Sequence, residues 1–151
     1  MSSNIIYINT DGGARGNPGP AGIGVVFFDE TEKEIHSYKE FIGVTTNNRA
    51  EYVAIYRAIL ILKKSEWYKK KNGEGIARVI CRLDSKLVVE QLLGNYKVKE
   101  AGMIEMKEKI QKVLSDFEIP IDFVHIGREQ NKRADKLVNE VLDEAAPETK
   151  R

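Results

Sequence analysis

The sequence predicts a mixed α/β domain, and two features of its pattern predict it. Three strand-like runs come first, and the short polar link between the second and the third favours an antiparallel hairpin. Segments with helical periodicity then alternate with two more strand-like runs, which is typical of α/β proteins. The chain has 151 residues, 42% of them hydrophobic, which suffices for one core. We therefore expect one domain over residues 1–146 and a frayed polar tail at 147–151.

The first three strands are predicted from apolar runs rich in Ile, Val, Phe and Tyr. They are expected from Ile5 onward, over Ile23–Phe28 and over Ile35–Ile42. Gly12 and Gly13 are predicted to end the first strand in a turn, so Asp11 is placed at its last position or just beyond. An Asp standing alone here is most often a turn former.

The first helix is predicted to begin at Asn48, whose side chain can cap the amides of the first turn. Glu51 follows three residues later and completes the pattern of a capping box. Glu51 also heads an apolar stripe at helical spacing, which consists of Ala54, Ile55 and Ala58. A carboxylate facing the sheet needs a partner because burying an unpaired charge costs several kcal/mol. A metal ion would supply one, so both interpretations of Glu51 stay open.

The central strand is predicted at Arg78–Leu83, with Asp84 at its carboxyl end. Ser85 is the expected cap of a helix over Lys86–Leu93. Ligands collect at the carboxyl ends of strands in open α/β sheets, which favours a site at Asp84. An ordinary turn Asp before a helix is the alternative.

The remaining elements are an amphipathic helix, a last strand over Ile119–Ile126 and a last helix over Asn131–Ala145. The apolar face of the amphipathic helix is interpreted as core and consists of Met103, Met106, Ile110, Val113, Leu114 and Phe117. Asp135 lies in the first or second turn of the last helix. The predicted order is therefore βββαβααβα.

The charge balance excludes binding of nucleic acid through bulk basicity. The 24 Lys and Arg against 23 Asp and Glu leave a net charge of +1, so any such binding must come from local patches. Candidate patches are Lys63–Lys64, Lys69–Lys71 and the pair Lys97 and Lys99. A solvated helix surface explains each of them as well.

A single cysteine excludes an intramolecular disulfide, and Cys81 lies in an apolar run where a small buried side chain is expected. The amino terminus lacks a basic segment followed by a long apolar stretch. We expect a soluble, cytoplasmic, monomeric protein without a membrane partner.

Four motifs carry a resemblance to a known family. They are Asp11–Gly22, Thr45–Glu51, Leu83–Ser85 and Arg128–Asp135. Together, and in the family's order, they resemble type I ribonuclease H over about Ile5 to Glu144. The resemblance implies a five-stranded mixed sheet, three antiparallel strands followed by parallel ones, flanked by helices. The chain is similar to the compact, archaeal-type members because it shows neither a basic protruding helix nor a separate hybrid-binding domain.

The resemblance implies an endonuclease that cuts the RNA strand of RNA–DNA hybrids with two Mg²⁺ or Mn²⁺ ions. It leaves 5′-phosphate and 3′-hydroxyl ends. Asp11 would bridge both ions, Glu51 and Asp84 would complete one site, and Asp135 would hold the second. The chemistry agrees, because four converging carboxylates repel one another and Mg²⁺ prefers carboxylate oxygens. Two such ions can activate a water and stabilise the leaving oxygen.

The resemblance also implies substrate contacts at family positions that touch the hybrid. These positions are Gly12, Gly13, Asn17, Asn47 and Asn48. Amide groups can recognise the ribose 2′-hydroxyl in a wide minor groove, although Asn and Gly are also what turns and caps require. Gln91 is a weaker candidate from its helix position.

Many family members carry a loop histidine before the last aspartate. His125 has the matching distance but falls inside a strand-like run, so Arg128 on the loop is our candidate for assisting catalysis. Two alternatives stay open. A few compact members also accept double-stranded RNA, and a non-catalytic module that binds hybrid could share the fold.

Overall fold

The computed structural model describes residues 4–69 and 75–145. The predicted tail at 147–151 and two of the candidate basic residues, Lys70 and Lys71, lie outside the described residues. Within them, the strands are β1 (Ile5–Ala14), β2 (Gly19–Phe28), β3 (Glu34–Thr45), β4 (Arg78–Leu83) and β5 (Ile121–His125). The helices are α1 (Asn47–Lys64), α2 (Glu66–Lys69), α3 (Lys86–Leu92), α4 (Ala101–Leu114) and α5 (Lys132–Ala145), and a 3-10 turn, η1 (Arg128–Gln130), precedes α5.

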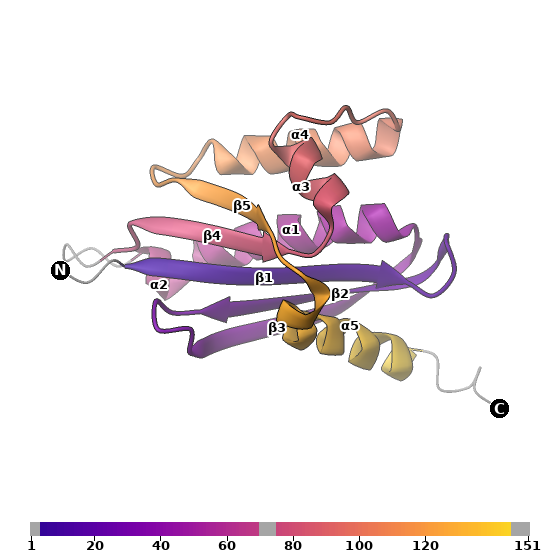
Figure 1. Ribbon diagram of the computed structural model, residues 1–151, viewed down its shortest axis with the longest axis horizontal. Coiled ribbons are helices and arrows are strands. Elements are labelled where there is room, and N and C mark those ends of the chain that lie inside the picture. The colour runs from indigo at the N-terminus through magenta and orange to yellow at the C-terminus, as the bar shows by residue number, and fades with distance from the viewer. Residues whose placement is uncertain (1–3, 70–74, 146–151) are drawn as a thin grey trace.

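The strands form one mixed sheet in the order β3-β2-β1-β4-β5 (Figure 1). β1, β2 and β3 pair antiparallel, whereas β4 pairs parallel with β1 and with β5. This arrangement confirms the five-stranded mixed sheet that the sequence predicts. The carboxyl ends of β1 and β4 therefore lie at the same edge of the sheet.

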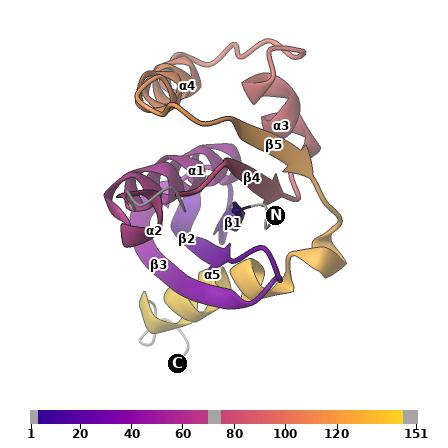
Figure 2. The same ribbon diagram turned by 90° about the vertical axis from the view of Figure 1, so that its left-hand side faces the viewer.

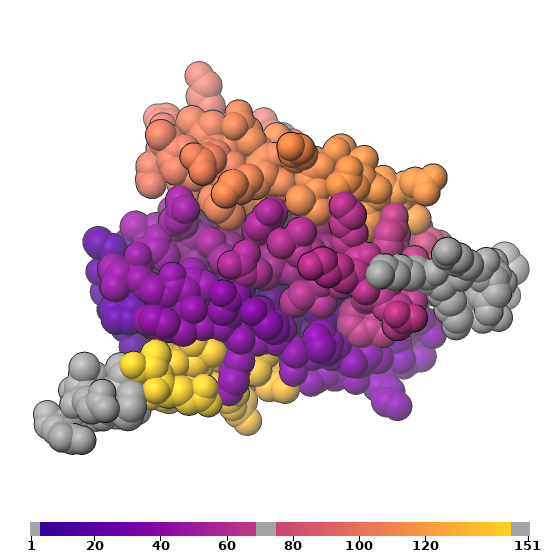
Figure 3. Space-filling model, turned by 180° about the vertical axis from the view of Figure 1, so that it is seen from behind, coloured from indigo at the N-terminus to yellow at the C-terminus, as the bar shows by residue number. Residues whose placement is uncertain are grey.

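Helices cover both faces of the sheet. α1 packs against β1 and β2 on one face, and α5 packs against β2, β3 and β1 on the other (Figure 2). α4 packs on α1 and forms the upper band of the molecule when it is seen from behind, with α5 as the lower band (Figure 3). The main core lies between the sheet and α1, and its fully buried members include Ile8, Phe27, Tyr52, Ile55 and Val79.

The first strand is longer than predicted, and the two glycines do not end it. β1 runs through Gly12 and Gly13 to Ala14 because its pairing with β2 continues to Ala14 opposite Ala21. Its pairing with β4 stops earlier, at Thr10 opposite Leu83. Asp11 thus lies inside β1, one residue past the last pair with β4.

Gly12 has a packing function in place of the predicted turn. A Cβ at this position would lie 2.3 Å from the backbone oxygen of Ala50 and 2.7 Å from the nitrogen of Glu51. Only glycine therefore allows α1 to approach β1 this closely. The approach carries Glu51 to the strand.

The prediction that Asn48 caps the first helix is wrong. Thr46 is the N-cap, and its side chain accepts a hydrogen bond from the nitrogen of Arg49 at 3.2 Å. Thr46 has extended backbone geometry, as an N-cap requires, and the helix begins at Asn47. Glu51 is therefore the fifth residue of α1 and forms no capping box. The predicted cap at Ser85 is confirmed, since its hydroxyl accepts from the nitrogen of Val88.

Other element boundaries differ by a few residues. β5 is shorter than the predicted strand, Phe117 lies beyond the end of α4, and α5 begins at Lys132. The short helix α2 was not predicted. None of the helices in the described part of the chain combines the length and apolarity that a membrane crossing requires.

Candidate active site

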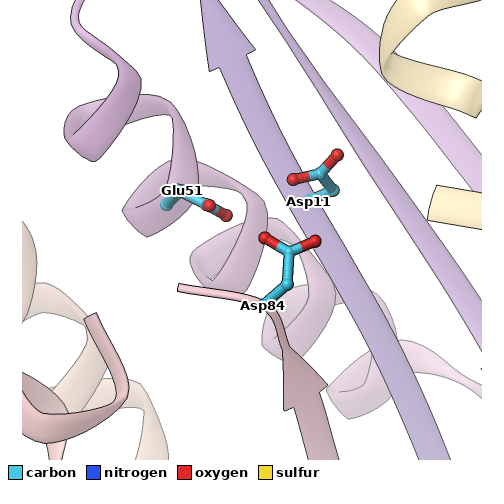
Figure 4. Close-up of side chains that lie close together, drawn as sticks. All are labelled: Asp11, Glu51 and Asp84. Atoms are coloured by element: carbon cyan, nitrogen blue, oxygen red, sulfur yellow. The ribbon is translucent and has the colours of Figure 1, made fainter. Parts of the chain in front are cut away.

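Three carboxylates from three separate elements converge at the edge of the sheet where β4 ends. Asp11 comes from β1, Glu51 from α1, and Asp84 from the residue that follows β4. One oxygen of each lies within 4.8 Å of an oxygen of the others. Figure 4 shows their carboxyl groups directed into a shared space. The register of β1 with β4 produces this meeting, because it places Asp11 and Asp84 side by side just past the last pair.

A cleft of about 500 Å³ opens over these groups. Its lining also includes Asp135 and Asn139 from α5 and Arg128 from η1. Four of the five predicted substrate-binding residues line the cleft as well, namely Gly12, Gly13, Asn47 and Asn48. Asn17 and His125 do not belong to the described lining of this cleft.

Glu51 is buried, with 8% of its surface exposed. Its Oε1 accepts a hydrogen bond from the nitrogen of Gly12 at 3.2 Å. Burial raises the pKa of Glu51 well above its ordinary value, and the charges of Asp11 and Asp84 raise it further. The Gly12 hydrogen bond and the charge of Arg128 act in the opposite direction. These two contributions do not offset the burial, so the ionised form of Glu51 lacks stabilisation that a bound cation would supply.

Asp11 lies close to the other carboxylates of the cluster. Burial raises its pKa from 3.8 to about 8, and the charges of Asp84 and Asp135 contribute in that order. A hydrogen bond between the carboxyl groups of Asp11 and Asp135 raises the pKa of Asp11 further. Asp135, the fourth predicted carboxylate, is therefore close to Asp11, although it comes from α5 on the face of the sheet opposite α1.

Asp135 is exposed and lies in the first turn of α5. The side-chain nitrogen of Asn139, one turn later, lies 3.4 Å from Oδ2 of Asp135 and 3.1 Å from its backbone oxygen. Arg15, at the tip of the β1–β2 hairpin, donates to Oδ1 of Asn139 at 3.5 Å and forms an ion pair with Asp143. These contacts connect the hairpin to the helix that carries Asp135.

Asn131 is a site residue that the sequence analysis missed. Its side-chain nitrogen donates to Oδ2 of Asp84 at 3.0 Å and to the backbone oxygen of Thr10 at 2.9 Å. The sequence alone predicts Asn131 only as the start of the last helix. Its position within the fourth motif, four residues before Asp135, was the one signal for another function.

The predicted substrate residues Asn17 and Asn47 also form local contacts. Asn17 Oδ1 accepts from the nitrogen of Asn47 at 2.9 Å, and Asn47 Oδ1 accepts from the nitrogen of Ala14 at 2.8 Å. Together they tie the β1–β2 hairpin to the first turn of α1. Both side chains belong to exposed residues, and among the described residues their amide nitrogens remain available as donors.

Gln91, the weaker candidate, has a structural environment. It is buried, accepts a hydrogen bond from the hydroxyl of Tyr52 at 2.7 Å, and donates to the backbone oxygen of Lys97. His125 is the last residue of β5 and is exposed, whereas Arg128 is exposed within the lining of the cleft. Position in the cleft thus favours Arg128 over His125 as a group that meets a ligand.

The donor set suits a hard divalent cation. It consists of carboxylate oxygens, which Mg²⁺ and Mn²⁺ prefer, without thiolates or imidazoles in the described cluster. Burial first, and then the neighbouring carboxylates, raise the pKa values of Asp11 and Glu51, so the ionised forms of both groups lack stabilisation in this cluster. A divalent cation would supply that stabilisation.

Comparison with known proteins gives a match over most of the chain. Residues 9–141 match a family model described as reverse transcriptase-like. A bifunctional protein of Mycobacterium tuberculosis is 36% identical over 142 residues, which cover 93% of this chain. The chain spans only 36% of the length of that relative.

Two solved structures are similar over nearly their whole length. LC11-RNase H1, isolated from compost by a metagenomic approach and crystallised in complex with an RNA/DNA hybrid, is 47% identical with a TM-score of 0.82. The match covers 93% of this chain and 98% of that chain. RNase H1 from the halophilic archaeon Halobacterium salinarum is 30% identical with a TM-score of 0.83, and the match again covers 93% and 98%.

The raised pKa of Asp11 predicts how the stability of the metal-free chain depends on pH. Because the folded pKa of about 8 exceeds the ordinary 3.8, the folded state binds the proton more tightly, and stability falls as the pH rises through this window. Asn resembles the protonated Asp. We therefore expect Asp11→Asn to raise the Tm by roughly 10–20 °C near pH 9 but only by roughly 3–7 °C near pH 5.

The control for this measurement is Asp29→Asn. Hydrogen bonds, first of all from Thr31, lower the pKa of Asp29, so it stays charged in both states across this pH range. Its Tm difference from the unmodified chain should not change with pH. A constant Tm difference for Asp11→Asn as well would contradict the raised pKa of Asp11.

Proposed function

The chain belongs to the ribonuclease H family, and on that premise we propose that it is an endonuclease that hydrolyses the RNA strand of RNA–DNA hybrids. The observation that carries the proposal is the convergence of Asp11, Glu51 and Asp84 within 4.8 Å at the floor of an open cleft. The solved relative that binds an RNA/DNA hybrid supports the choice of substrate, since it is 47% identical over nearly the whole chain.

The proposed cofactors are two Mg²⁺ or Mn²⁺ ions. Asp11 would be shared by both, Glu51 and Asp84 would complete one site, and Asp135 would hold the second. When bound, such ions activate a water for attack on the phosphodiester and stabilise the leaving 3′ oxygen, which gives 5′-phosphate and 3′-hydroxyl ends. No covalent nucleophile is needed.

The chain's own residues fix the carboxylates before a ligand arrives. The nitrogen of Gly12 holds Oε1 of Glu51, and the side chain of Asn131 holds Oδ2 of Asp84. Such preorganisation lowers the barrier because the ligands need not be reoriented during the reaction. The rigid elements β1, β4 and α1 carry three of the four groups.

The hybrid would bind along the rim of the cleft, where its ribose groups would be recognised. We propose that the backbone at Gly12 and Gly13 and the amides of Asn17, Asn47 and Asn48 contact the ribose 2′-hydroxyls, which accept and donate hydrogen bonds. Four of these residues line the cleft, and Asn17 is held next to it by Asn47. B-form DNA would lose these contacts because it lacks the 2′-hydroxyl and has a narrower minor groove.

Arg128 is proposed to bind the scissile phosphate through charge. It lies in the lining of the cleft, and its charge lowers the pKa of Glu51, so the two side chains interact electrostatically. We further propose that the enzyme acts as a monomer, because one copy of the chain supplies all four carboxylates.

Cleavage of three duplexes, an RNA–DNA hybrid, double-stranded RNA and double-stranded DNA, tests the function. We expect Mg²⁺-dependent cutting of the RNA in an RNA–DNA hybrid, no cutting of double-stranded DNA, and no reaction with chelator. The Glu51→Gln variant keeps an acceptor for Gly12 but loses the charge, so its rate should fall at least about 100-fold. Glu105→Gln on the exposed surface of α4 is the matched control and should keep full activity.

The remaining outcomes decide between the alternatives. Cutting of double-stranded RNA as well would broaden the substrate class. Binding of the hybrid without any metal-dependent cutting would refute the enzymatic proposal and identify the chain as a binding module. Ligation of the labelled products would verify the 5′-phosphate.

Replacing Arg128 tests its assisting function. Arg128→Ala should lower kcat by roughly 10-fold to 100-fold, in line with a positioned charged group, and Arg128→Lys should restore part of the loss. His125→Ala, three positions earlier and also exposed, is the control and should react at the unmodified rate. The reverse pattern, with a loss only in His125→Ala, would transfer the assisting function to the histidine.

A further inference from the structure

Asn131 forms hydrogen bonds to three of the candidate catalytic residues, Asp84, Arg128 and Asp135, and to the residue before a fourth, Asp11. Its side-chain nitrogen bonds Oδ2 of Asp84 and the backbone oxygen of Thr10, the residue before Asp11. Its backbone oxygen accepts from the nitrogen of Asp135 at 3.1 Å, and its backbone nitrogen donates to the oxygen of Arg128 at 2.9 Å. One fully buried residue thus connects β1, the end of β4, η1 and α5.

The orientation of the side-chain amide is fixed by its partners. Both the carboxylate oxygen of Asp84 and the carbonyl oxygen of Thr10 are acceptors, so the nitrogen of the amide must face them. The flipped amide would place a third acceptor against these two. Asn131 therefore acts as a donor toward the cluster.

A structural function in capping α5 does not explain this geometry. A capping Asn uses its side-chain oxygen to accept from the first amides of the helix. Oδ1 of Asn131 is buried and, among the described residues, has no hydrogen-bond partner. An unsatisfied buried acceptor costs stability, which a residue chosen only for folding would avoid.

We propose that Asn131 is a positioning residue that orients Asp84 for a divalent cation and holds Asp135 in register with the strand-borne carboxylates. The inference rests on the metal site of the proposed function. Because the amide holds Oδ2 of Asp84, the other oxygen of this carboxylate is free of that contact and can bind a cation in the space shared with Asp11 and Glu51. The hydrogen bond to a charged oxygen is of the stronger kind, so it restricts the rotation of the carboxyl group.

The test is Mn²⁺ binding to the full chain without nucleic acid, measured by calorimetry. We expect Asn131→Ala to weaken binding by roughly 10-fold to 100-fold, the usual effect of removing a residue that orients a metal ligand. The matched control is Asn9→Ala. Asn9 is also buried, lies in β1 and is hydrogen-bonded to Arg82 and Gln130, but it contacts no carboxylate of the cluster.

The control separates positioning from general destabilisation. Both variants should lower the Tm, because each removes a buried amide, but only Asn131→Ala should lose affinity for Mn²⁺. Equal losses of affinity, or unchanged affinity in Asn131→Ala, would overturn the inference. If the unmodified chain binds no Mn²⁺ at all, the proposed metal site fails first and the inference falls with it.

A second measurement applies if Asn131→Ala does not fold. In the unmodified chain, the NMR chemical shift of the Asn131 side-chain amide should change when Mg²⁺ is added, because the Asp84 carboxylate that accepts its hydrogen bond would then also bind the cation. The exposed side-chain amide of Asn95, bonded to Glu90, is the reference and should not move. An Asn131 amide that stays unchanged at saturating Mg²⁺ would contradict the proposal.

Discussion

The structure depends on holding mutually repelling carboxylates together at one edge of a sheet. Burial and the charges of its neighbours raise the pKa of Asp11 to about 8, and the same causes raise the pKa of Glu51. A fold that only needed stability would place apolar or paired side chains here. A divalent cation would neutralise this repulsion. The close approach of the carboxylates therefore accounts both for the instability of the metal-free cluster and for its capacity to bind a cation.

Local features of the backbone produce this convergence. β1 extends beyond the end of β4, so Asp11 and Asp84 lie next to each other without sharing a ladder pair. The missing side chain of Gly12 allows α1 to approach β1 closely enough for Glu51 to reach the same space. The turn η1 and Asn131 then bring α5 from the opposite face. Ordinary requirements of packing and pairing thus determine the geometry of the site.

The mixed α/β order could be predicted from the sequence because strand-like runs and helical periodicity are local properties, whereas the five-stranded sheet and the set of four acidic residues came from the resemblance to ribonuclease H. The sequence did not predict that β1 passes through Gly12 and Gly13, since Gly12 is required by a close contact with α1, which is distant in sequence. The cap of α1 was misplaced because Asn is preferred over Thr at an N-cap, whereas the contact of Asn17 with the nitrogen of Asn47 fixes the helix start one residue after Thr46. Asn131 was missed because its partners, Thr10 and Asp84, are far away along the chain.

The most direct test of the account is the position of Mn²⁺ ions, located by anomalous scattering in crystals of the chain with a hybrid that cannot be cleaved. The account predicts one ion between Asp11, Glu51 and Asp84 and a second one between Asp11 and Asp135. Anomalous density confined to other acidic residues, or none in the cleft, would contradict the claim that the fold assembles these carboxylates to bind divalent cations.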